Sequence, residues 1–493
     1  MLSYFRNLIP LSPFIAPSIN STIQPPSSPV PAASTTQPTL SPISNIQGHA
    51  YNRFIQIWLE NTDFALAAGD PNIAWLSTHG ISLTNYWALT HPSQPNYLAA
   101  VSGDHFGLDS DDYISVPSNI PIVADLLDTK GIAWGEYQED MPYAGFKGIE
   151  YNNQHTGANA YVRKHNPLVL FESVTQNATR LSLMKSFTSF AADLAAGTLP
   201  QWAFVTPNMT NDGHDTSITT AGLWARSFLE PLLNNAYFMN DTLVLLTFDE
   251  NEHYETPNKV FSLLLGGAVP ESLKGLMDNT FYTHYSALSS LEANFDLPSL
   301  GRWDCGANIF ELVAKKTGYA NYAVDTTNLW FSSSYPGPLS PMDAKAWPAP
   351  NTNAKCAAGN GVLEKVMSVW GRVDGSLHYA DPYPHDDGLG ANASVSRLPT
   401  PSQMAPSTNL VQSGTASGPS PTATETTGLV QSGTQLSPSQ TVPDTTGTAP
   451  GGTLPSSAGA SVMYTAGAVT MDLGAAWCWD WTLAALGLMA GFL

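Results

Sequence analysis

The chain has 493 residues, which is enough for a large buried core and would allow two or three domains. It contains 19 Lys+Arg against 40 Asp+Glu, a formal net charge of −21 at pH 7, and no basic run. This balance argues against nucleic acid as a partner, because such binding depends on neutralising backbone phosphates. A phosphate ester would also be repelled unless its site supplied local positive charge, which a bound metal ion can do.

Composition divides the chain into parts. Ser, Thr, Pro, Gly and Ala dominate from about Asn392 to Ser461, with almost no aromatic residues, so this stretch cannot bury enough apolar surface to fold. We therefore predict a leader and disordered lead-in over 1–47, one globular α/β domain over 48–385, a disordered Ser/Thr/Pro-rich stalk over 386–461 and a hydrophobic tail over 462–493.

The two ends of the chain differ in what they indicate. Small residues at Ser456–Ser461, a spacer, and an apolar run from Leu473 to Leu493 form the pattern of a glycosylphosphatidylinositol attachment signal. A membrane-spanning anchor is the alternative, weakened by Asp480 inside the run and by the lack of a basic residue after it. At the other end, the apolar segment Leu8–Ala16 is broken by two prolines, so a signal peptide and an unstructured leader remain equal alternatives.

Glycosylation sequons and cysteines bear on the compartment. Five sequons begin at Asn20, Asn177, Asn208, Asn240 and Asn392. Together with the stalk they favour a secreted or cell-surface glycoprotein that meets membrane or cell wall only through a lipid anchor. The three cysteines fit no zinc motif. If processing removes Cys478 with the tail, Cys305 and Cys356 remain, and we predict that they pair and close a loop of about 50 residues.

Strand-like and helix-like segments alternate through the globular part. The predicted strands, mostly continuous apolar runs, are Phe54–Leu59, Ile132–Tyr137, Trp202–Thr206, Thr242–Phe248 and Val260–Leu265. The predicted helices, several ended by a glycine, are Ile120–Thr129, Ser182–Ala196, Leu223–Asn234, His284–Asn294 and Ala307–Lys316. Interleaved strands and helices predict a three-layer α/β/α sandwich around a mainly parallel sheet.

Two acidic pairs follow two of these strands. Glu60-Asn61 follows the first, and Asp249-Glu250 follows the fourth. In an open α/β sheet, ligands bind just outside the carboxyl ends of the strands. Carboxylates placed there suit a hard cation or an acid/base role. Between the pairs, Ser93 lies in a turn flanked by two prolines, at a helix start. The combination predicts metal-assisted phosphoester hydrolysis.

The order of four motifs resembles a known family. Glu60-Asn61 is followed by His-Pro-Ser93-Gln-Pro-Asn96, then by Thr-Pro-Asn-Met-Thr-Asn-Asp-Gly-His214-Asp215, and then by Asp249-Glu250. This order resembles the phosphoesterase family of acid phosphatases and non-specific phospholipases C, and most closely its fungal secreted acid phosphatases. The resemblance covers about residues 50–315.

The resemblance implies a fold, a metal site and a nucleophile. The implied fold is the α/β/α sandwich of the alkaline phosphatase superfamily. The implied metal ligands are Glu60, Asn61, Asp249 and Glu250, and the implied nucleophile is Ser93. The implied activity is hydrolysis of small phosphomonoesters. Oxygen ligands slightly favour Ca²⁺, Mg²⁺ or Mn²⁺ as the divalent cation, whose identity stays open.

Further polar residues are assigned to the site with less specific roles. His214 is expected to protonate the leaving oxygen, which protonated histidine does best at acidic pH. Substrate-binding or supporting roles are expected for Asn96, Asp215, His253 and His284. The phospholipase branch usually continues its second acidic pair with His-Gly-Gly. Here Asn251-Glu252-His253-Tyr254 follows instead, which leaves the role of His253 open and favours the phosphatase branch. A phospholipase C and a non-catalytic wall-anchored protein of the same fold are the alternatives.

Overall fold

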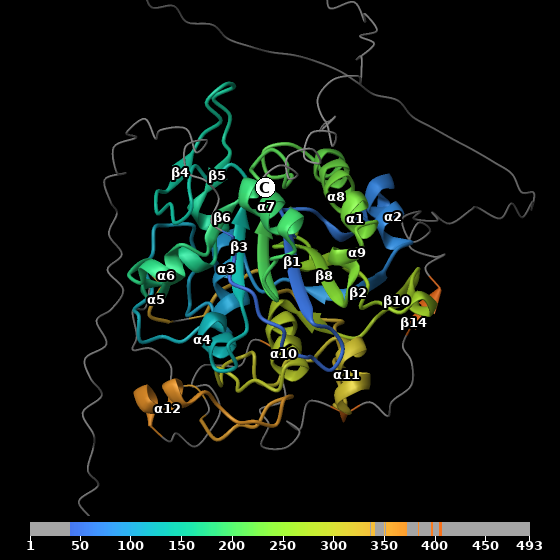
Figure 1. The fold of residues 1–493 in the computed structure, drawn as a ribbon. Helices are drawn as coiled ribbons and strands as arrows, with labels where there is room; N and C mark the ends of the chain where they lie inside the picture. The colour runs from blue at the N-terminus through green and yellow to red at the C-terminus, as the bar shows by residue number, and fades with distance from the viewer. Residues whose placement is uncertain are drawn as a thin grey trace, which may run out of the picture. The chain divides into compact units, whose positions relative to one another are not determined.

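The computed structural model describes residues 40–335, 337–340, 350, 352–371, 383, 396–397 and 404–406. Its centre is one ten-stranded sheet (Figure 1). In chain order the strands of this sheet are β1 (Arg53–Leu59), β2 (Ile81–Trp87), β3 (Trp134–Gln138), β6 (Met184–Ser186), β7 (Trp202–Thr206), β8 (Thr242–Phe248), β9 (Lys259–Leu265), β10 (Leu276–Asp278), β11 (Tyr282–Thr283) and β14 (Met404–Pro406).

The sheet is mainly parallel, as predicted. Its strand order is β14-β10-β2-β9-β8-β1-β7-β3-β6, with β11 beside β2. The pairs β8–β1, β1–β7, β7–β3, β3–β6 and β10–β2 are parallel. Strand β9 is antiparallel to both of its neighbours, and β14 is antiparallel to β10. The strands β1, β2, β7 and β8 therefore point the same way, and their carboxyl ends lie at one edge of the sheet.

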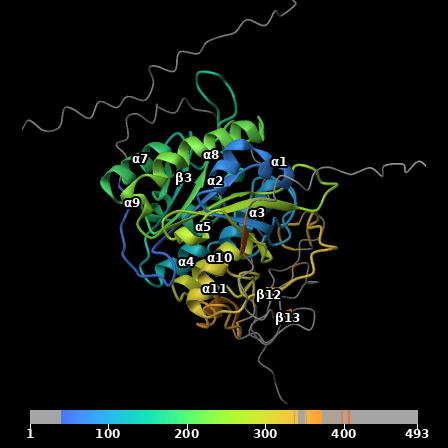
Figure 2. The same cartoon turned by 90° about the vertical axis from the view of Figure 1, so that its right-hand side faces the viewer.

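Helices cover both faces of the sheet, which confirms the three-layer arrangement (Figures 1 and 2). One layer contains α1 (Phe64–Gly69), α2 (Pro71–Ser77), α7 (Phe187–Ala196), α8 (Ile218–Leu233) and α9 (Ala236–Met239). The other contains α3 (Ser93–Ser102), α4 (Val123–Asp128), α10 (His284–Asn294) and α11 (Glu311–Thr317). The remaining elements are β4 (Glu150–Tyr151), β5 (Tyr161–Val162), η2 (Arg163–His165), η3 (Leu168–Leu170), α5 (Glu172–Thr175), α6 (Ala178–Leu181), η4 (Glu271–Leu273), β12 (Tyr322–Ala323), α12 (Glu364–Trp370) and β13 (Ser396–Arg397).

Two of the differences from the sequence prediction concern strands of the main sheet. The predicted helix Ser182–Ala196 divides, because Met184–Ser186 pairs with β3 as strand β6 before α7 begins. Strand β2 (Ile81–Trp87) was not predicted. Its apolar alternation breaks at the polar Thr84-Asn85, where a register shift between Leu83 and Tyr86 marks an irregularity in its pairing with β9. A strand with such an interruption lacks a continuous two-residue period.

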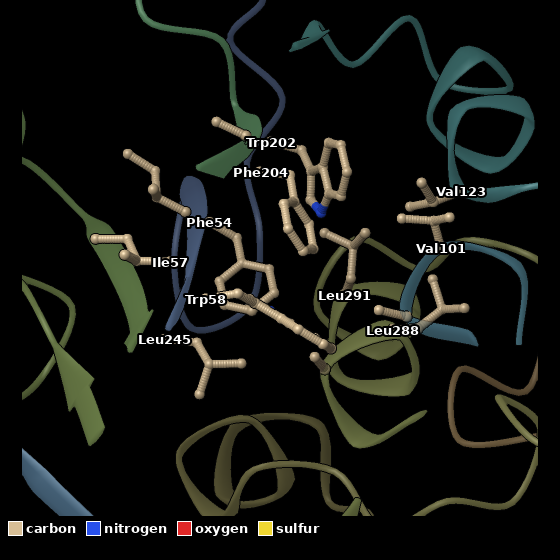
Figure 3. Packing of buried hydrophobic residues seen from close by; sticks show 14 of the residues in the cluster. Phe54, Ile57, Trp58, Val101, Val123, Trp202, Phe204, Leu245, Leu288 and Leu291 are labelled. Carbon is tan, nitrogen blue, oxygen red and sulfur yellow. The ribbon is translucent and has the colours of Figure 1, made fainter. Parts of the chain in front are cut away.

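The core between the sheet and the α3/α10 layer consists of large side chains (Figure 3). Phe54 and Trp58 of β1 lie on the same face because side chains alternate along a strand. This face packs against residues of α3, α4 and α10. Each of the side chains in this contact is at most 1% exposed: Phe54, Trp58, Val101, Val123, Trp202, Phe204, Leu288 and Leu291. This packing fixes the position of α3 relative to β1, and with it the strand-end turn that precedes α3.

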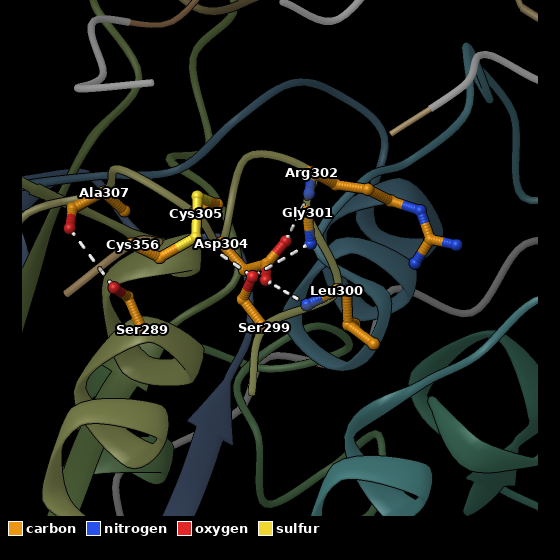
Figure 4. Close-up of a disulfide and its surroundings, with 9 residues drawn as sticks. All are labelled: Ser289, Ser299, Leu300, Gly301, Arg302, Asp304, Cys305, Ala307 and Cys356. Atoms are coloured by element: carbon orange, nitrogen blue, oxygen red, sulfur yellow. Dashed lines mark hydrogen bonds between the residues drawn. A yellow bond between two sulfur atoms is a disulfide. The ribbon is translucent and has the colours of Figure 1, made fainter. Parts of the chain in front are cut away.

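The predicted disulfide between Cys305 and Cys356 is present (Figure 4). Their Cα atoms are 4.7 Å apart, and 51 positions separate them in the chain. Next to the bond, Asp304 accepts hydrogen bonds from the backbone N–H groups of Leu300 (2.7 Å) and Arg302 (2.9 Å). The disulfide thus joins the segment after α10 to the segment before α12.

The predicted leader, stalk and tail lie largely outside the described residues, as do Asn20, Asn392 and Cys478. Among the residues that are described, no helix is long and apolar enough to cross a membrane. The domain boundaries at 48 and 385 therefore stay predictions. The lead-in expected up to residue 47 includes Ser41, whose hydroxyl donates a 2.7 Å hydrogen bond to Asp193.

Candidate active site at the carboxyl edge of the sheet

The two acidic pairs meet at the shared carboxyl edge. Strands β1 and β8 pair in register up to Leu59 and Phe248, so Glu60 and Asp249 follow at adjacent positions. Both side chains are fully buried. The backbone N–H of Asn61 donates a 3.1 Å hydrogen bond to Asp249 Oδ1. The register of two neighbouring parallel strands therefore brings together residues that are 189 positions apart.

Ser93 is the first residue of α3, in the connection that follows β2. Its hydroxyl donates a hydrogen bond to Glu60 Oε2 at 3.1 Å. Tyr97, one turn further along α3, donates its hydroxyl to Glu60 Oε1. Gly103 ends the helix in the left-handed conformation (φ 73°), which glycine adopts without strain. The Pro-flanked turn thus holds Ser93 against the first acidic pair.

Asn96 connects this turn to the second acidic pair. Its Nδ2 donates to Glu250 Oε2 (3.1 Å) and to the Thr90 carbonyl (2.8 Å). Its Oδ1 accepts the backbone N–H of Leu89 at 3.0 Å. Asn61 Nδ2 donates to Glu250 Oε1 at 3.4 Å. Both oxygens of Glu250 are therefore held by amide groups.

Asp212 and His165 complete the cluster and were not assigned roles from the sequence. Asp212 follows β7, and its carbonyl accepts the backbone N–H of Glu60 at 2.9 Å. His165 ends η2, with Nε2 3.4 Å from Glu60 Oε1 and Nδ1 3.5 Å from Asp212 Oδ2. Ligand atoms of Glu60, His165 and Asp212 all lie within 4.8 Å of one another, so this buried trio could hold a metal ion.

Lys164 was also missed, and it is the residue before His165. Its Nζ forms a 2.9 Å ion pair with Asp111 and lies 3.4 Å from His214 Nε2. The signal in the sequence was the tripeptide Arg163-Lys164-His165, which places two cations and a histidine together in a chain with only 19 Lys+Arg. Nothing in that run indicated that the chain returns it to the carboxyl edge of the sheet.

The buried carboxylates raise one another's pKa values. Burial is the main cause for Glu60, Asp212 and Glu250, whose pKa values lie well above the usual range, and the Asp249 charge raises all three further. Burial raises the pKa of Asp249 to about 7. Burial also lowers the pKa of His165 well below its usual range, which keeps this imidazole neutral. The cluster therefore has a deficit of positive charge.

Several polar atoms of the cluster are buried and make no hydrogen bond. They are Asn61 Oδ1, Asp212 Oδ2, Asp249 Oδ2 and both ring nitrogens of His165. Leaving such atoms unsatisfied costs about 1–3 kcal/mol each. Carboxylate, amide and imidazole atoms of this kind are metal ligands, and a divalent cation would both satisfy them and offset the charge. The residues present therefore fit a metal ion.

The other residues assigned from the sequence lie around the cluster. His284 is fully buried, and its Nε2 donates a 2.6 Å hydrogen bond to the Asp249 carbonyl. Burial lowers the pKa of His284 to about 3, so it supports Asp249 as a neutral ring. Asp215 accepts from His214 Nδ1 at 2.8 Å. His253 is exposed and pairs with Asp63 at 2.6 Å.

The fold and the site define the class of protein. The model of the phosphoesterase family matches residues 43–298, and the chain belongs to this family. It is 58% identical over 368 residues to an acid phosphatase of Aspergillus fumigatus, an alignment covering 74% of this chain and 82% of the relative. It is 55% identical to a phosphate-repressible acid phosphatase of Penicillium chrysogenum, over 74% of this chain and 89% of the relative. The expected similarity to fungal acid phosphatases is thus confirmed.

Similarity to solved structures is remote. A crystal structure of a protein in the alkaline phosphatase superfamily from Vibrio parahaemolyticus aligns with a TM-score of 0.34 and 14% sequence identity. The alignment covers 53% of this chain and 72% of the other.

Proposed function

We propose that this protein hydrolyses phosphate monoesters through the Ser93 hydroxyl, as an acid phosphatase outside the cell. The observation that supports this most is the hydrogen bond from Ser93 to Glu60, formed between the segments that follow β2 and β1. The names of the similar fungal proteins, acid phosphatases at 53–58% identity, support the reaction type. The Cys305–Cys356 disulfide supports an oxidising compartment.

A divalent cation would be held by Glu60, Asn61, Asp249 and Glu250. Asn61 Oδ1 and Asp249 Oδ2 are buried without hydrogen-bond partners, which suits them as ligands. His165 and Asp212 are the further candidates, through the trio that they form with Glu60. When bound, the cation would supply positive charge against the phosphoryl oxygens. All-oxygen ligation favours Ca²⁺, Mg²⁺ or Mn²⁺, whereas a histidine ligand would suit a transition metal.

The chain's own residues account for the proton transfers. As Ser93 Oγ bonds to phosphorus and the ester P–O bond breaks, Glu60 Oε2 is placed to accept the hydroxyl proton. The departing oxygen needs a proton in turn. His214 lies at the edge of the cluster beside Lys164, and is the proposed donor. Water then hydrolyses the phosphoserine. The first turn of α3 orients Ser93 throughout, because Ser93 and Tyr97 both donate to Glu60.

A comparison of two substrates tests the proposal. The purified full chain should hydrolyse p-nitrophenyl phosphate, and a chelator should abolish this activity, which excess divalent cation should restore. Phosphatidylcholine should be a poor substrate. Preference for phosphatidylcholine would indicate the phospholipase C alternative, and no turnover of either substrate under any metal would indicate a non-catalytic protein.

A further inference from the structure

Lys164 places a positive charge at the rim of the carboxylate cluster. Its side chain is 21% exposed, and its Nζ lies 2.9 Å from Asp111 Oδ2. A lysine ammonium carries a positive charge at neutral pH, and this one remains within reach of solvent. It is a cation at the end of a flexible side chain, and its partner is the partly exposed carboxylate of Asp111.

Asp111 links this cation to the serine turn. Its other oxygen, Oδ1, accepts the backbone N–H of Gln94 at 3.0 Å, and Gln94 is the residue after Ser93. The Gln94 side chain donates to the Asp112 carbonyl at 2.7 Å and so fixes the loop that contains Asp111. The contact chain Lys164–Asp111–Gln94 thus holds the ammonium group next to the turn that presents the Ser93 hydroxyl.

His214 lies on the other side of Lys164. Its Nδ1 is 2.8 Å from Asp215 Oδ1, and carboxylates only accept, so Nδ1 donates. Its Nε2 then faces the Lys164 ammonium across 3.4 Å. The ring is about one-third exposed. Lys164 and His214 therefore present two adjacent nitrogen groups at the open side of the buried cluster.

The charge balance at the cluster indicates what Lys164 and His214 do. A phosphomonoester is a dianion near neutral pH, and at this site it must approach four buried acidic groups. A divalent cation would offset only two of their negative charges. Lys164 is a basic residue whose charge acts on Glu60, Asp212 and Glu250. The neighbouring Arg163 is committed elsewhere, because its guanidinium donates to the carbonyls of Ile114 and Val169.

We propose that Lys164 binds the non-bridging oxygens of a dianionic phosphoryl group beside the proton donor His214, with Asp111 holding the ammonium in place when the site is empty. The ligand class is a phosphomonoester or inorganic phosphate. This inference rests on the proposed function and adds a source of selectivity to it. Above about pH 6, where a phosphomonoester is a dianion, a phosphodiester has one negative charge fewer, so it gains less from Lys164 and is the poorer substrate.

Removing the charge at Lys164 tests the site. Lys164→Gln should raise both the inhibition constant of inorganic phosphate and the KM for p-nitrophenyl phosphate by about tenfold or more, as expected for loss of a charged hydrogen bond. The KM for bis(p-nitrophenyl) phosphate should change by less than about threefold. Lys164→Arg, which keeps the charge, should restore most of the phosphate affinity. Lys274→Gln is the matched control, because Lys274 pairs with the exposed Glu271 at 2.6 Å.

Two results would overturn the proposal. One is an unchanged phosphate inhibition constant in Lys164→Gln, and the other is an equal loss on monoester and diester, which a merely structural lysine would produce. If Lys164→Gln does not fold, Lys164→Met removes the same charge with an unbranched side chain and takes its place. If the wild type hydrolyses neither ester, the proposed function fails. Calorimetry of inorganic phosphate binding to the wild type and the variant then still tests whether Lys164 binds phosphate. Weaker binding by the variant supports the site, and equal binding refutes it.

Discussion

The Ser93 hydroxyl donates a hydrogen bond to Glu60 Oε2 across 3.1 Å, although the two residues are 33 positions apart. Glu60 directly follows β1 and Ser93 begins α3, so one contact joins a strand end to a helix start. Tyr97 of the same helix donates to the second oxygen of Glu60. The first turn of α3 therefore fixes the carboxylate and the hydroxyl relative to each other, as the proposed roles of nucleophile and proton acceptor require.

Ser93→Ala should abolish hydrolysis of p-nitrophenyl phosphate while leaving the fold and the metal content intact, since only the attacking oxygen is removed. The expected loss in kcat is several orders of magnitude. Ser102→Ala, at the other end of α3, is the control and should retain activity, because Ser102 donates to the Leu98 carbonyl within its own helix. Retention of a tenth or more of wild-type activity by Ser93→Ala would rule out the nucleophile.

Glu60→Gln and Asp249→Asn should each lower bound metal and activity together. Each replaces a buried anionic oxygen with a neutral one, and both residues are fully buried in the cluster. Elemental analysis of the purified variants beside their turnover rates measures this. Glu252→Gln is the control, since Glu252 is exposed and only three positions from Asp249. If a variant kept its full metal content, the residue replaced in it would not be a metal ligand.

The extent to which the sequence predicted this site depends on where each residue lies in the chain. Glu60, Asp249 and Glu250 directly follow apolar strands, so their position at the carboxyl edge follows from the parallel sheet. Lys164 and His165 lie in the short helix η2, which follows the two-stranded sheet of β4 and β5. No hydrophobic periodicity and no helix cap in that stretch indicates that it folds back on Glu60. Long-range packing of irregular segments has no local signal.

The same distinction applies to the fold. The strands Trp202–Thr206 and Thr242–Phe248 and the helix His284–Asn294 have the predicted bounds, because each is a continuous buried element with clear ends. Strand β6 was predicted as part of a helix, since Met184-Lys185-Ser186 is too short to show a strand period, and its partner β3 alone decides its conformation.

Glu136→Gln should flatten the pH dependence of stability. Glu136 is fully buried on β3, which raises its pKa from 4.5 to about 8. Between these two values the folded state binds a proton that the unfolded state has lost, so the free energy of unfolding falls as pH rises across this window. The shift corresponds to a few kcal/mol. Urea unfolding at steps from pH 5 to pH 8 should show the wild type losing stability relative to Glu136→Gln. Parallel curves would contradict the assignment.

Replacing both Cys305 and Cys356 by Ala should lower the free energy of unfolding by about 4 kcal/mol, from the chain entropy of the 51-residue separation. Activity at low temperature should remain, because the disulfide lies among residues that follow α10, away from the strand ends that bear the acidic pairs. Thermal unfolding and turnover of the double variant test the two statements separately. A free thiol at both positions in the mature wild-type chain would remove the basis of the prediction.

The most direct test of the serine mechanism is to trap its intermediate. The full chain, loaded with divalent cation, is mixed with p-nitrophenyl phosphate, quenched in acid during turnover and digested for mass spectrometry. The predicted result is one added phosphoryl group on the peptide that contains Ser93, located on Ser93 itself and missing in Ser93→Ala. An active enzyme with no phosphate on Ser93 at any quench time, and an active Ser93→Ala variant, would contradict the assignment of Ser93 as the nucleophile.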